Sequence, residues 1–321
     1  MRYYKKQDLV AINELLGRKI ENCYNSTFFN PLAEILMIHR VRQRDIGNLP
    51  YFEDMNIPPS VLENKLMRIL DMGFEFITLD DLKIILVNGN LKSNKKKFVI
   101  TIDDGYKETF DTLYPILKKM NLPFTLFVSS SFPNKEIALW WNYLNDLLIS
   151  NNYLDLPYFG PMQINTLEQK QQAYIKLSRE ILKLGNEINT KFEMLFNFDY
   201  SSIVNKYKNQ LLDWRDLEVM KMDSLCTIGA HTNKHFGLRY SDLDTVKNDI
   251  LENVKDLEEH LGVIPKHFAF PYGTFFSIGK REFELVKRMG FETAVNTYSA
   301  EVYSRDRNNL FSLPRTVIKY D

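Results

Sequence analysis

Short apolar runs alternate with longer amphipathic stretches along most of the chain. The runs have the length of buried strands, and apolar positions between them recur every three or four residues, as in helices that pack on one side. The expected strands lie at residues 35–38, 74–78, 98–102, 124–129, 225–230, 267–270, 291–296 and 310–313. Strands that alternate with helices in this way pair in parallel, so the pattern predicts an α/β fold.

One long stretch, residues 134–210, breaks this alternation. It is poor in glycine, rich in lysine, asparagine and leucine, and has helical patterns around 140–148 and 167–184 with few strand signals. We therefore expect an inserted, mainly helical subdomain within a single domain that spans residues 1–321. A further amphipathic helix is expected at 8–20, where packing against the body is favoured over attachment to a membrane surface.

Composition narrows the classes of protein to consider. The chain has 321 residues, 45% hydrophobic and 26% charged, which is typical of a globular protein with a sizeable core. Its 41 basic and 41 acidic residues cancel, so we expect no nucleic-acid partner, and we expect the basic run at 95–97 to be a solvated loop. The chain has no run of about 18 apolar residues, so no transmembrane segment is expected. The first residues lack the apolar core of a signal peptide, so we expect a cytoplasmic location.

Two polar pairs follow apolar runs directly. Asp103 and Asp104 come after the run 98–102, and His231 and His235 come after a run that ends at 230. Because parallel strands end at one edge of a sheet, these side chains are expected to meet there. One carboxylate and two imidazoles leave an open position on a divalent ion, and the second carboxylate is then free to act as a base. The aspartate pair alone also fits a turn with helix-capping carboxylates, and the histidine pair alone also fits a solvated helix face.

Three motifs in order resemble those of the polysaccharide deacetylases, the NodB-homology group of carbohydrate esterase family four. They are Thr101-Ile-Asp-Asp-Gly-Tyr106, His231-Thr-Asn-Lys-His235 and Phe268-Ala-Phe-Pro-Tyr-Gly273. The resemblance covers about residues 35–130 and 212–318. It implies a distorted (β/α)7 barrel and a metal-dependent hydrolase that removes N-acetyl groups from a carbohydrate. The expected cytoplasmic location favours an acetamido sugar in a polysaccharide, glycolipid or sugar nucleotide as the substrate.

The resemblance also implies roles for individual residues. Asp104, His231 and His235 would hold one divalent ion, with zinc favoured and nickel, cobalt or manganese also compatible with this ligand set. Asp103 would be the catalytic base. The backbone N–H of Tyr272, presented by the turn that Pro271 begins, would stabilise the oxyanion, although an ordinary turn remains an alternative.

Two departures from the commonest family pattern change the candidate list. No histidine follows His267, so the usual C-terminal Leu-x-His acid is missing. His39 instead resembles the N-terminal Tyr-His-x-Val histidine of circularly permuted poly-N-acetylglucosamine deacetylases, which implies a general acid; a satisfied core histidine is the alternative. The third motif also lacks its arginine. Arg315 resembles the C-terminal Leu-Pro-Arg of the permuted group, and either orients Asp103 or forms a surface salt bridge.

Three alternatives stay open or are weakened by the residues. The aromatic residues that begin the insert, Trp140, Trp141 and Tyr143, either stack on sugars or pack in the core, and core packing is favoured. A zinc peptidase needs Glu after the first histidine of the pair, where this chain has Thr232. A non-catalytic, glycan-binding relative of the same fold is the remaining alternative, and the presence of base, ligands and candidate acid argues against it.

Overall fold

The centre of the fold is a parallel sheet, described by a computed structural model that covers residues 31–89, 95–318 and 320. Seven strands follow in the order β11–β10–β9–β6–β5–β1–β12, and β4 pairs with β5 as an eighth. Their bounds are β1 Ala33–Ile38, β4 Glu75–Phe76, β5 Lys97–Ile102, β6 Phe124–Val128, β9 Cys226–Ala230, β10 His267–Ala269, β11 Thr293–Val295 and β12 Thr316–Val317. The helix expected at 8–20 lies outside the described residues.

The two ends of this row of strands are joined by residues 310–313. Leu313 forms a parallel bridge with Val295 of β11, and β12 then pairs with β1. The Ala294 N–H also donates to the Leu310 carbonyl at 2.8 Å. The sheet therefore curls into a distorted barrel of seven strands, and the predicted fold class is confirmed. The expected last strand at 310–313 is wrong in detail, because the longer pairing begins only after Pro314, which has no N–H to donate.

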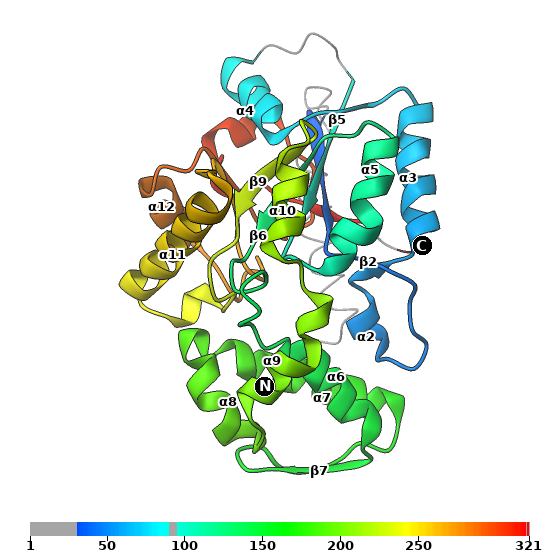
Figure 1. Cartoon of the computed structure of the whole chain (residues 1–321), viewed down its shortest axis with the longest axis vertical. Coiled ribbons are helices and arrows are strands. Elements are labelled where there is room, and N and C mark those ends of the chain that lie inside the picture. The colour runs from blue at the N-terminus through cyan, green and yellow to red at the C-terminus, as the bar shows by residue number, and fades with distance from the viewer. Residues whose placement is uncertain (1–30, 90–94, 319, 321) are drawn as a thin grey trace.

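Helices cover the outside of the sheet (Figure 1). They are α3 Pro59–Asp71, α4 Leu79–Asn88, α5 Tyr114–Lys119, α10 Trp214–Lys221, α11 Leu243–Leu261 and α12 Lys280–Arg288. Every residue of β5 and β6 is buried, as expected for strands covered on both faces. The helix expected near 107–120 instead begins with a π-helical turn, Thr109–Leu113, and continues as α5.

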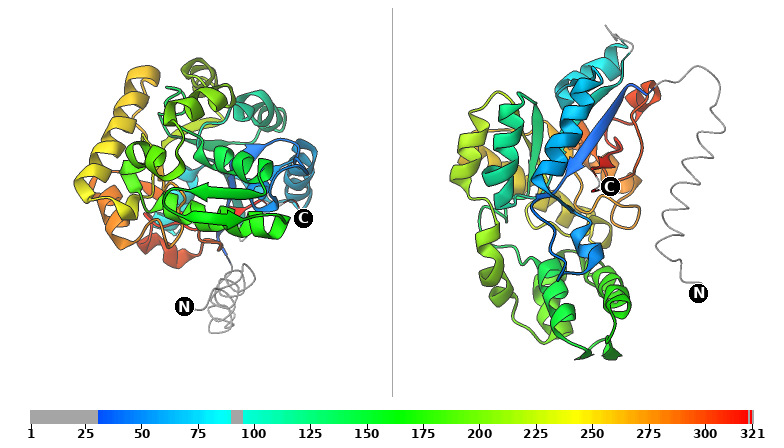
Figure 2. Two further views of the ribbon diagram at one scale, coloured as in Figure 1. Left: turned by 90° about the horizontal axis from the view of Figure 1, so that it is seen from below. Right: turned by 90° about the vertical axis from the view of Figure 1, so that its right-hand side faces the viewer.

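Residues 134–210, here called the insert, lie between β6 and α10. The insert contains α6 Trp140–Ser150, β7 Tyr153–Leu156, β8 Gly160–Gln163, α7 Leu167–Leu182, α8 Ile188–Phe196 and α9 Tyr200–Tyr207. It has an apolar cluster largely of its own and lies across one end of the barrel (Figures 1 and 2). The antiparallel hairpin β7–β8 was not predicted, although β7 alternates exposed and buried residues.

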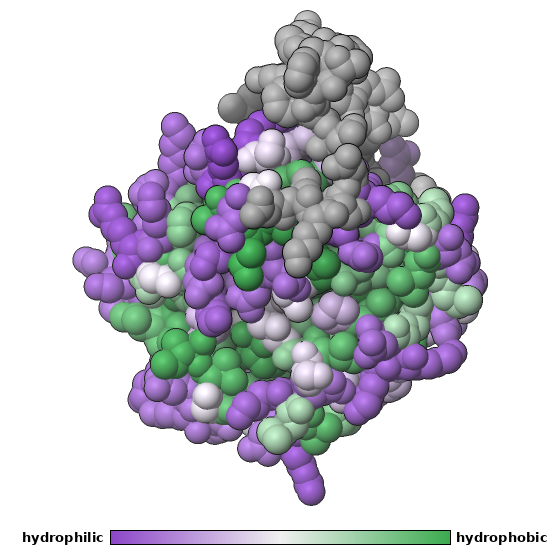
Figure 3. All heavy atoms as spheres, turned by 90° about the horizontal axis from the view of Figure 1, so that it is seen from above, coloured by the Kyte–Doolittle hydropathy of each residue, from purple (hydrophilic) through white to green (hydrophobic). Residues whose placement is uncertain are grey.

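The face opposite the insert shows patches of hydrophobic residues separated by hydrophilic ones (Figure 3). On this side of the barrel the predicted solvated basic loop at 95–97 is wrong for its last two residues, whereas Lys95 is exposed. Lys97 is buried at the start of β5 and pairs with Glu75, and Lys96 pairs with Glu34 at 2.8 Å and Glu301 at 2.7 Å. Among the described residues, the helices are all too short or too polar to cross a membrane.

Candidate active site

The order of the strands brings the predicted site residues to one edge of the barrel. His39 follows β1, Asp103 and Asp104 follow β5, and His231 follows β9. Because these strands are parallel, their carboxyl ends lie together at the end of the barrel that faces the insert. Arg315 reaches the same place from the residue before β12, which pairs with β1.

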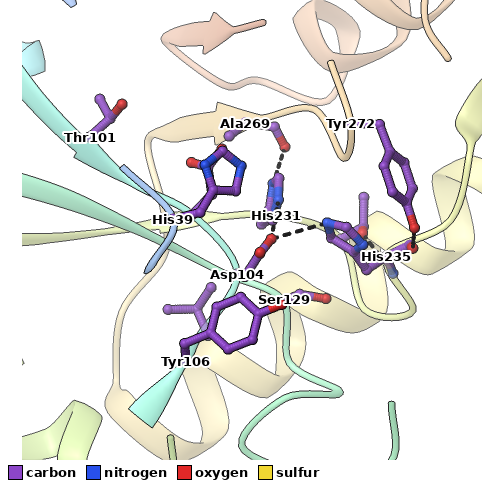
Figure 4. Close-up of polar contacts among 12 residues, drawn as sticks. His39, Thr101, Asp104, Tyr106, Ser129, His231, His235, Ala269 and Tyr272 are labelled. Atoms are coloured by element: carbon purple, nitrogen blue, oxygen red, sulfur yellow. Dashed lines mark hydrogen bonds and ion pairs between the residues drawn. The ribbon is translucent and has the colours of Figure 1, made fainter. Parts of the chain in front are cut away.

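Asp104 and two imidazoles converge on one point (Figure 4). Asp104 Oδ1 lies 3.3 Å from His231 Nε2 and 3.1 Å from His235 Nε2, and one ligand atom of each residue lies within 4.8 Å of the others. All three side chains are buried. The structure thus brings together the three residues that the sequence singled out as metal ligands.

The local hydrogen bonds fit a metal ion at this point. His231 Nδ1 donates to the Ala269 carbonyl at 2.7 Å, which fixes the ring with its Nε2 facing Asp104. Asp104 Oδ1 is buried and accepts no hydrogen bond from the described residues. Burial alone would raise the pKa of the Asp104 carboxyl. His235 and His231 lower this pKa by more than burial raises it, so it lies well below the usual value. An ionised, unsatisfied oxygen facing two imidazole nitrogens is the donor set of a divalent transition metal.

The backbone at the site is strained. Asp104, Thr232, His235 and Tyr272 all have positive φ angles, of 77°, 65°, 49° and 61°. Such conformations cost on the order of 1–3 kcal/mol each and persist only where the surroundings hold them. These residues lie in three turns, after β5, β9 and β10, and their conformations let side chains from the three turns point at one another. Gly105, next to Asp104, must lack a Cβ, because a Cβ there would lie 3.1 Å from Phe132 Cβ.

Asp103 is held by a fully buried arginine. Arg315 Nη1 and Nη2 donate to the two Asp103 carboxylate oxygens at 2.7 and 2.6 Å, and Arg315 Nε donates to the Asn296 carbonyl at 2.8 Å. Burial raises the pKa of Asp103, but Arg315 and the neighbouring imidazoles outweigh it and hold the pKa below its ordinary value. Because Arg315 has no exposed surface, the surface salt bridge considered from the sequence is ruled out.

His39 lies beside the same carboxylate. Its Nε2 is 3.7 Å from Asp103 Oδ2, and its side chain keeps 16% of its surface exposed. Burial lowers the pKa of His39, and Asp103 and Asp104 oppose this only in part. An imidazole at this position lies beside the carboxylates and keeps part of its surface in contact with solvent, unlike a histidine that is enclosed in a core.

The turn after β10 completes this edge. The Tyr272 ring lies 4.8 Å from the His235 ring, and its hydroxyl donates to the His235 carbonyl at 3.3 Å. Pro271 before it is buried, and Thr297 Oγ1 donates to the Tyr272 carbonyl at 3.0 Å. The Tyr272 N–H donates to no acceptor within the described residues.

The insert brings aromatic residues to the site, although the sequence favours core packing for them. Trp141 is partly exposed, its ring lies 5.6 Å from the His235 ring, and its Nε1 donates to the Tyr106 hydroxyl at 2.7 Å. Trp140 is buried and lies 6.4 Å from the Tyr272 ring. Tyr143 does pack inside the insert, stacked on Phe198 at 4.6 Å.

A second residue after β1 also ties the insert to this edge. Arg40 donates to Glu108 at 2.5 Å and to Gln210 of the insert at 3.1 Å, and its guanidinium lies 4.1 Å from the centre of the Tyr106 ring. Neither Arg40 nor Tyr106 was singled out as a site residue from the sequence. Their contacts depend on how the insert docks, and no local sequence signal reports that.

The fold and the edge just described place the chain among α/β barrels with carboxylates and imidazoles at the carboxyl ends of their strands. Residues 90–294 match the family model described as Polysaccharide deacetylase. This region is more than half of the chain, so the chain belongs to the polysaccharide deacetylase family. The resemblance seen in the three motifs is thereby confirmed.

Individual relatives agree with this membership. The chain is 29% identical over 138 residues to "Putative polysaccharide deacetylase YxkH" of Bacillus subtilis (strain 168), which covers 43% of this chain and 46% of that protein. The match therefore spans less than half of the relative's length.

Solved structures show the same fold at low sequence identity. The Streptococcus pyogenes deacetylase PplD, in complex with acetate, has 16% identity and a TM-score of 0.59, and the alignment covers 91% of this chain and 95% of that one. IcaB from Ammonifex degensii has 17% identity and a TM-score of 0.54, with 90% and 93% covered. The de-N-acetylase from Aggregatibacter actinomycetemcomitans has 16% identity and a TM-score of 0.55, with 90% and 95% covered.

Proposed function

We propose that the chain is a metal-dependent N-deacetylase acting on an N-acetylated carbohydrate. The observation that carries this proposal is the pair of adjacent carboxylates, each in a different electrostatic setting. Asp104 faces two imidazole nitrogens without a hydrogen bond, whereas Asp103 is held in two hydrogen bonds by Arg315. Two neighbouring carboxylates with different partners can divide the work of a ligand and a base.

Asp104, His231 and His235 would hold the metal ion. When bound, a divalent cation lowers the pKa of a water and offers positive charge to a carbonyl oxygen. Zinc is our first choice for two imidazoles and a carboxylate, although the same ligands also suit nickel, cobalt and manganese. Family membership is consistent with such an ion.

The residues around it would carry the proton transfers. Asp103 accepts the proton of the attacking water, and Arg315 keeps that carboxylate ionised and oriented. The Tyr272 N–H donates to the acetyl oxygen as negative charge develops there. His39 donates a proton to the leaving nitrogen, because an amine leaves poorly until it is protonated. The C–N bond breaks, a C–O bond forms, and the products are acetate and a free amine on the sugar.

The substrate class rests on family membership and on the partly exposed Trp141 beside His235, since indole rings pack well against apolar sugar faces. One neighbour of the same fold was solved with acetate and another is named a de-N-acetylase. Choosing among a polysaccharide, a glycolipid and a sugar nucleotide requires experiment, and the cytoplasmic location expected from the sequence stays a prediction.

Acetate release tests the proposal directly. Purified protein with one zinc per chain is incubated with a panel of N-acetylated oligosaccharides and sugar nucleotides, and acetate is measured for wild type and for Asp103→Asn. We expect acetate from at least one class of substrate with wild type and almost none with the variant. If the metal-loaded protein binds a glycan but releases no acetate from any, the non-catalytic, glycan-binding alternative is correct.

A further inference from the structure

Helix α11 carries a row of polar residues on the side that faces the metal-ligand loop, residues 231–235. Asp249, Asn253 and Asp256 are spaced by four and three positions, so they lie on one face of the helix. Asp249 is 5% exposed and Asn253 is fully buried. A buried helix face is ordinarily apolar, because a buried polar group is unfavourable unless it is hydrogen-bonded.

Two of these side chains bind the backbone of the loop. Asp249 Oδ2 accepts from the Asn233 N–H at 3.0 Å, and its Oδ1 accepts from the Lys234 N–H at 3.1 Å. Asn253 Oδ1 accepts from the His231 N–H at 3.1 Å. Three of the five loop residues therefore have their N–H groups held by α11.

Three further hydrogen bonds connect this row and the loop to each other and to the barrel. Asn253 Nδ2 donates to the Val128 carbonyl at the end of β6 at 3.0 Å. The Asn233 side chain donates to Asp256 at 3.1 Å and to Ser130 at 2.9 Å. The loop is thus connected to α11 and to the end of β6, while its own backbone is strained at Thr232 and His235.

We propose that Asp249 and Asn253 are positioning residues that set the separation and direction of the two imidazoles for the metal ion. The proposal rests on the proposed metal-binding function and deepens it. Asp249 can hold the loop backbone because each of its two oxygens accepts from one of two consecutive N–H groups. The amide of an asparagine would offer only one accepting oxygen, and its NH₂ group would face the other N–H. Such residues, which hold ligands rather than touch the metal, typically change metal affinity by about 10–100-fold when replaced.

The test uses the metal alone as probe. Zinc affinity of the metal-free, full-length protein is measured by competition with a chromophoric chelator for wild type, Asp249→Asn and Asn253→Leu. Asn253→Leu keeps the size of the side chain but leaves the His231 N–H without an acceptor, and it serves if Asp249→Asn fails to fold. Glu259→Gln is the matched control, because this substitution also replaces a carboxylate by an amide, but on the exposed side of the same helix.

We expect both positioning variants to bind zinc about 10–100-fold more weakly than wild type and the control to match wild type. The visible spectrum of the cobalt-loaded protein should also change in the two variants, because it reports ligand geometry and not fold stability. Melting temperature of the metal-free proteins is recorded on the same samples.

Two results would overturn the proposal. One is zinc affinity within about threefold of wild type in both variants, with a lower melting temperature, which would make the row a purely structural feature. The other is a wild-type protein that binds neither zinc nor cobalt, which would contradict the metal-binding function itself. The two failures are therefore distinguishable.

Discussion

Replacing Arg315 by methionine tests the electrostatic argument for Asp103 most sharply. Methionine roughly keeps the volume but removes the guanidinium, which donates to both Asp103 oxygens, to Thr101 Oγ1 at 3.2 Å and to the Asn296 carbonyl. Both members of the pair are almost fully buried. Breaking a buried ion pair from one side leaves an uncompensated charge, and this lowers the free energy of unfolding by about 3–5 kcal/mol.

The effect of Arg315→Met should depend on pH. In wild type the pKa of Asp103 lies below its ordinary value of 3.8, so this group adds stability that is present above that value and is lost as pH falls through the folded-state pKa. In the variant, the Arg315 charge no longer offsets burial, so burial raises the pKa of Asp103. The buried, unpaired carboxylate lowers the free energy of unfolding most near neutral pH, and this loss shrinks as the carboxyl takes up a proton. The stability gap between the proteins should therefore narrow as pH is lowered.

Denaturant unfolding of the metal-free proteins measures this gap at about pH 7 and again at about pH 5. A double-mutant cycle with Asp103→Asn isolates the pair, and we expect the double variant to be more stable than the sum of the single losses implies. A loss below about 1 kcal/mol that does not vary with pH, or a coupling energy near zero, would refute the reasoning.

Three further outcomes follow from the site. Asp103→Asn should keep stoichiometric zinc and lose acetate release by about 10²–10⁴-fold, because an amide cannot take up the proton of the water; undiminished turnover at full metal content would remove Asp103 as the base. His39→Ala should lower kcat. In wild type, kcat/KM should fall as pH rises through the pKa of His39, which burial lowers from 6.5, because only the protonated imidazole donates, and the variant should lose this alkaline limb. A lower melting temperature with unchanged kcat would reassign His39 to structure. Zinc at about 100 times its Kd should raise the free energy of unfolding by about 2.7 kcal/mol, and His235→Ala should show no comparable rise in a chelator-controlled melt.

Much of the fold could be predicted because its elements carry strong local signals. The apolar runs of β5 and β6 are long enough to show as strands, and α11 is capped by Asp242 before it and by Gly262, with a φ of 62°, after it. The two-residue β12 carries no periodicity. Its pairing with β1 depends on closure of the whole barrel, which no local pattern reports.

The site divides in the same way. His231, His235 and the two aspartates could be found because each pair follows a strand directly. The burial of Arg315 could not be predicted, since it follows from the closing segment reaching across to β5. The contact of Trp141 with His235 depends on the direction in which the insert docks. The row on α11 was missed because Asp249 and Asn253 resemble ordinary polar positions of an amphipathic helix.

The closing segment, residues 310–317, brings Arg315 to Asp103 later in synthesis than the parts of the chain that carry the candidate metal ligands. During synthesis this segment emerges after strands β1 to β11, so Asp103 lacks the Arg315 guanidinium until the segment has been made. The three candidate metal ligands lie on the loops after β5 and β9, which are already present by then. If heat or proteolysis released this segment alone, Arg315 would leave Asp103 while the loops after β5 and β9 stayed in place. If the proposed function holds, such a molecule would keep the candidate metal ligands but lack the guanidinium that holds the proposed base, so metal content would overstate the amount of active enzyme.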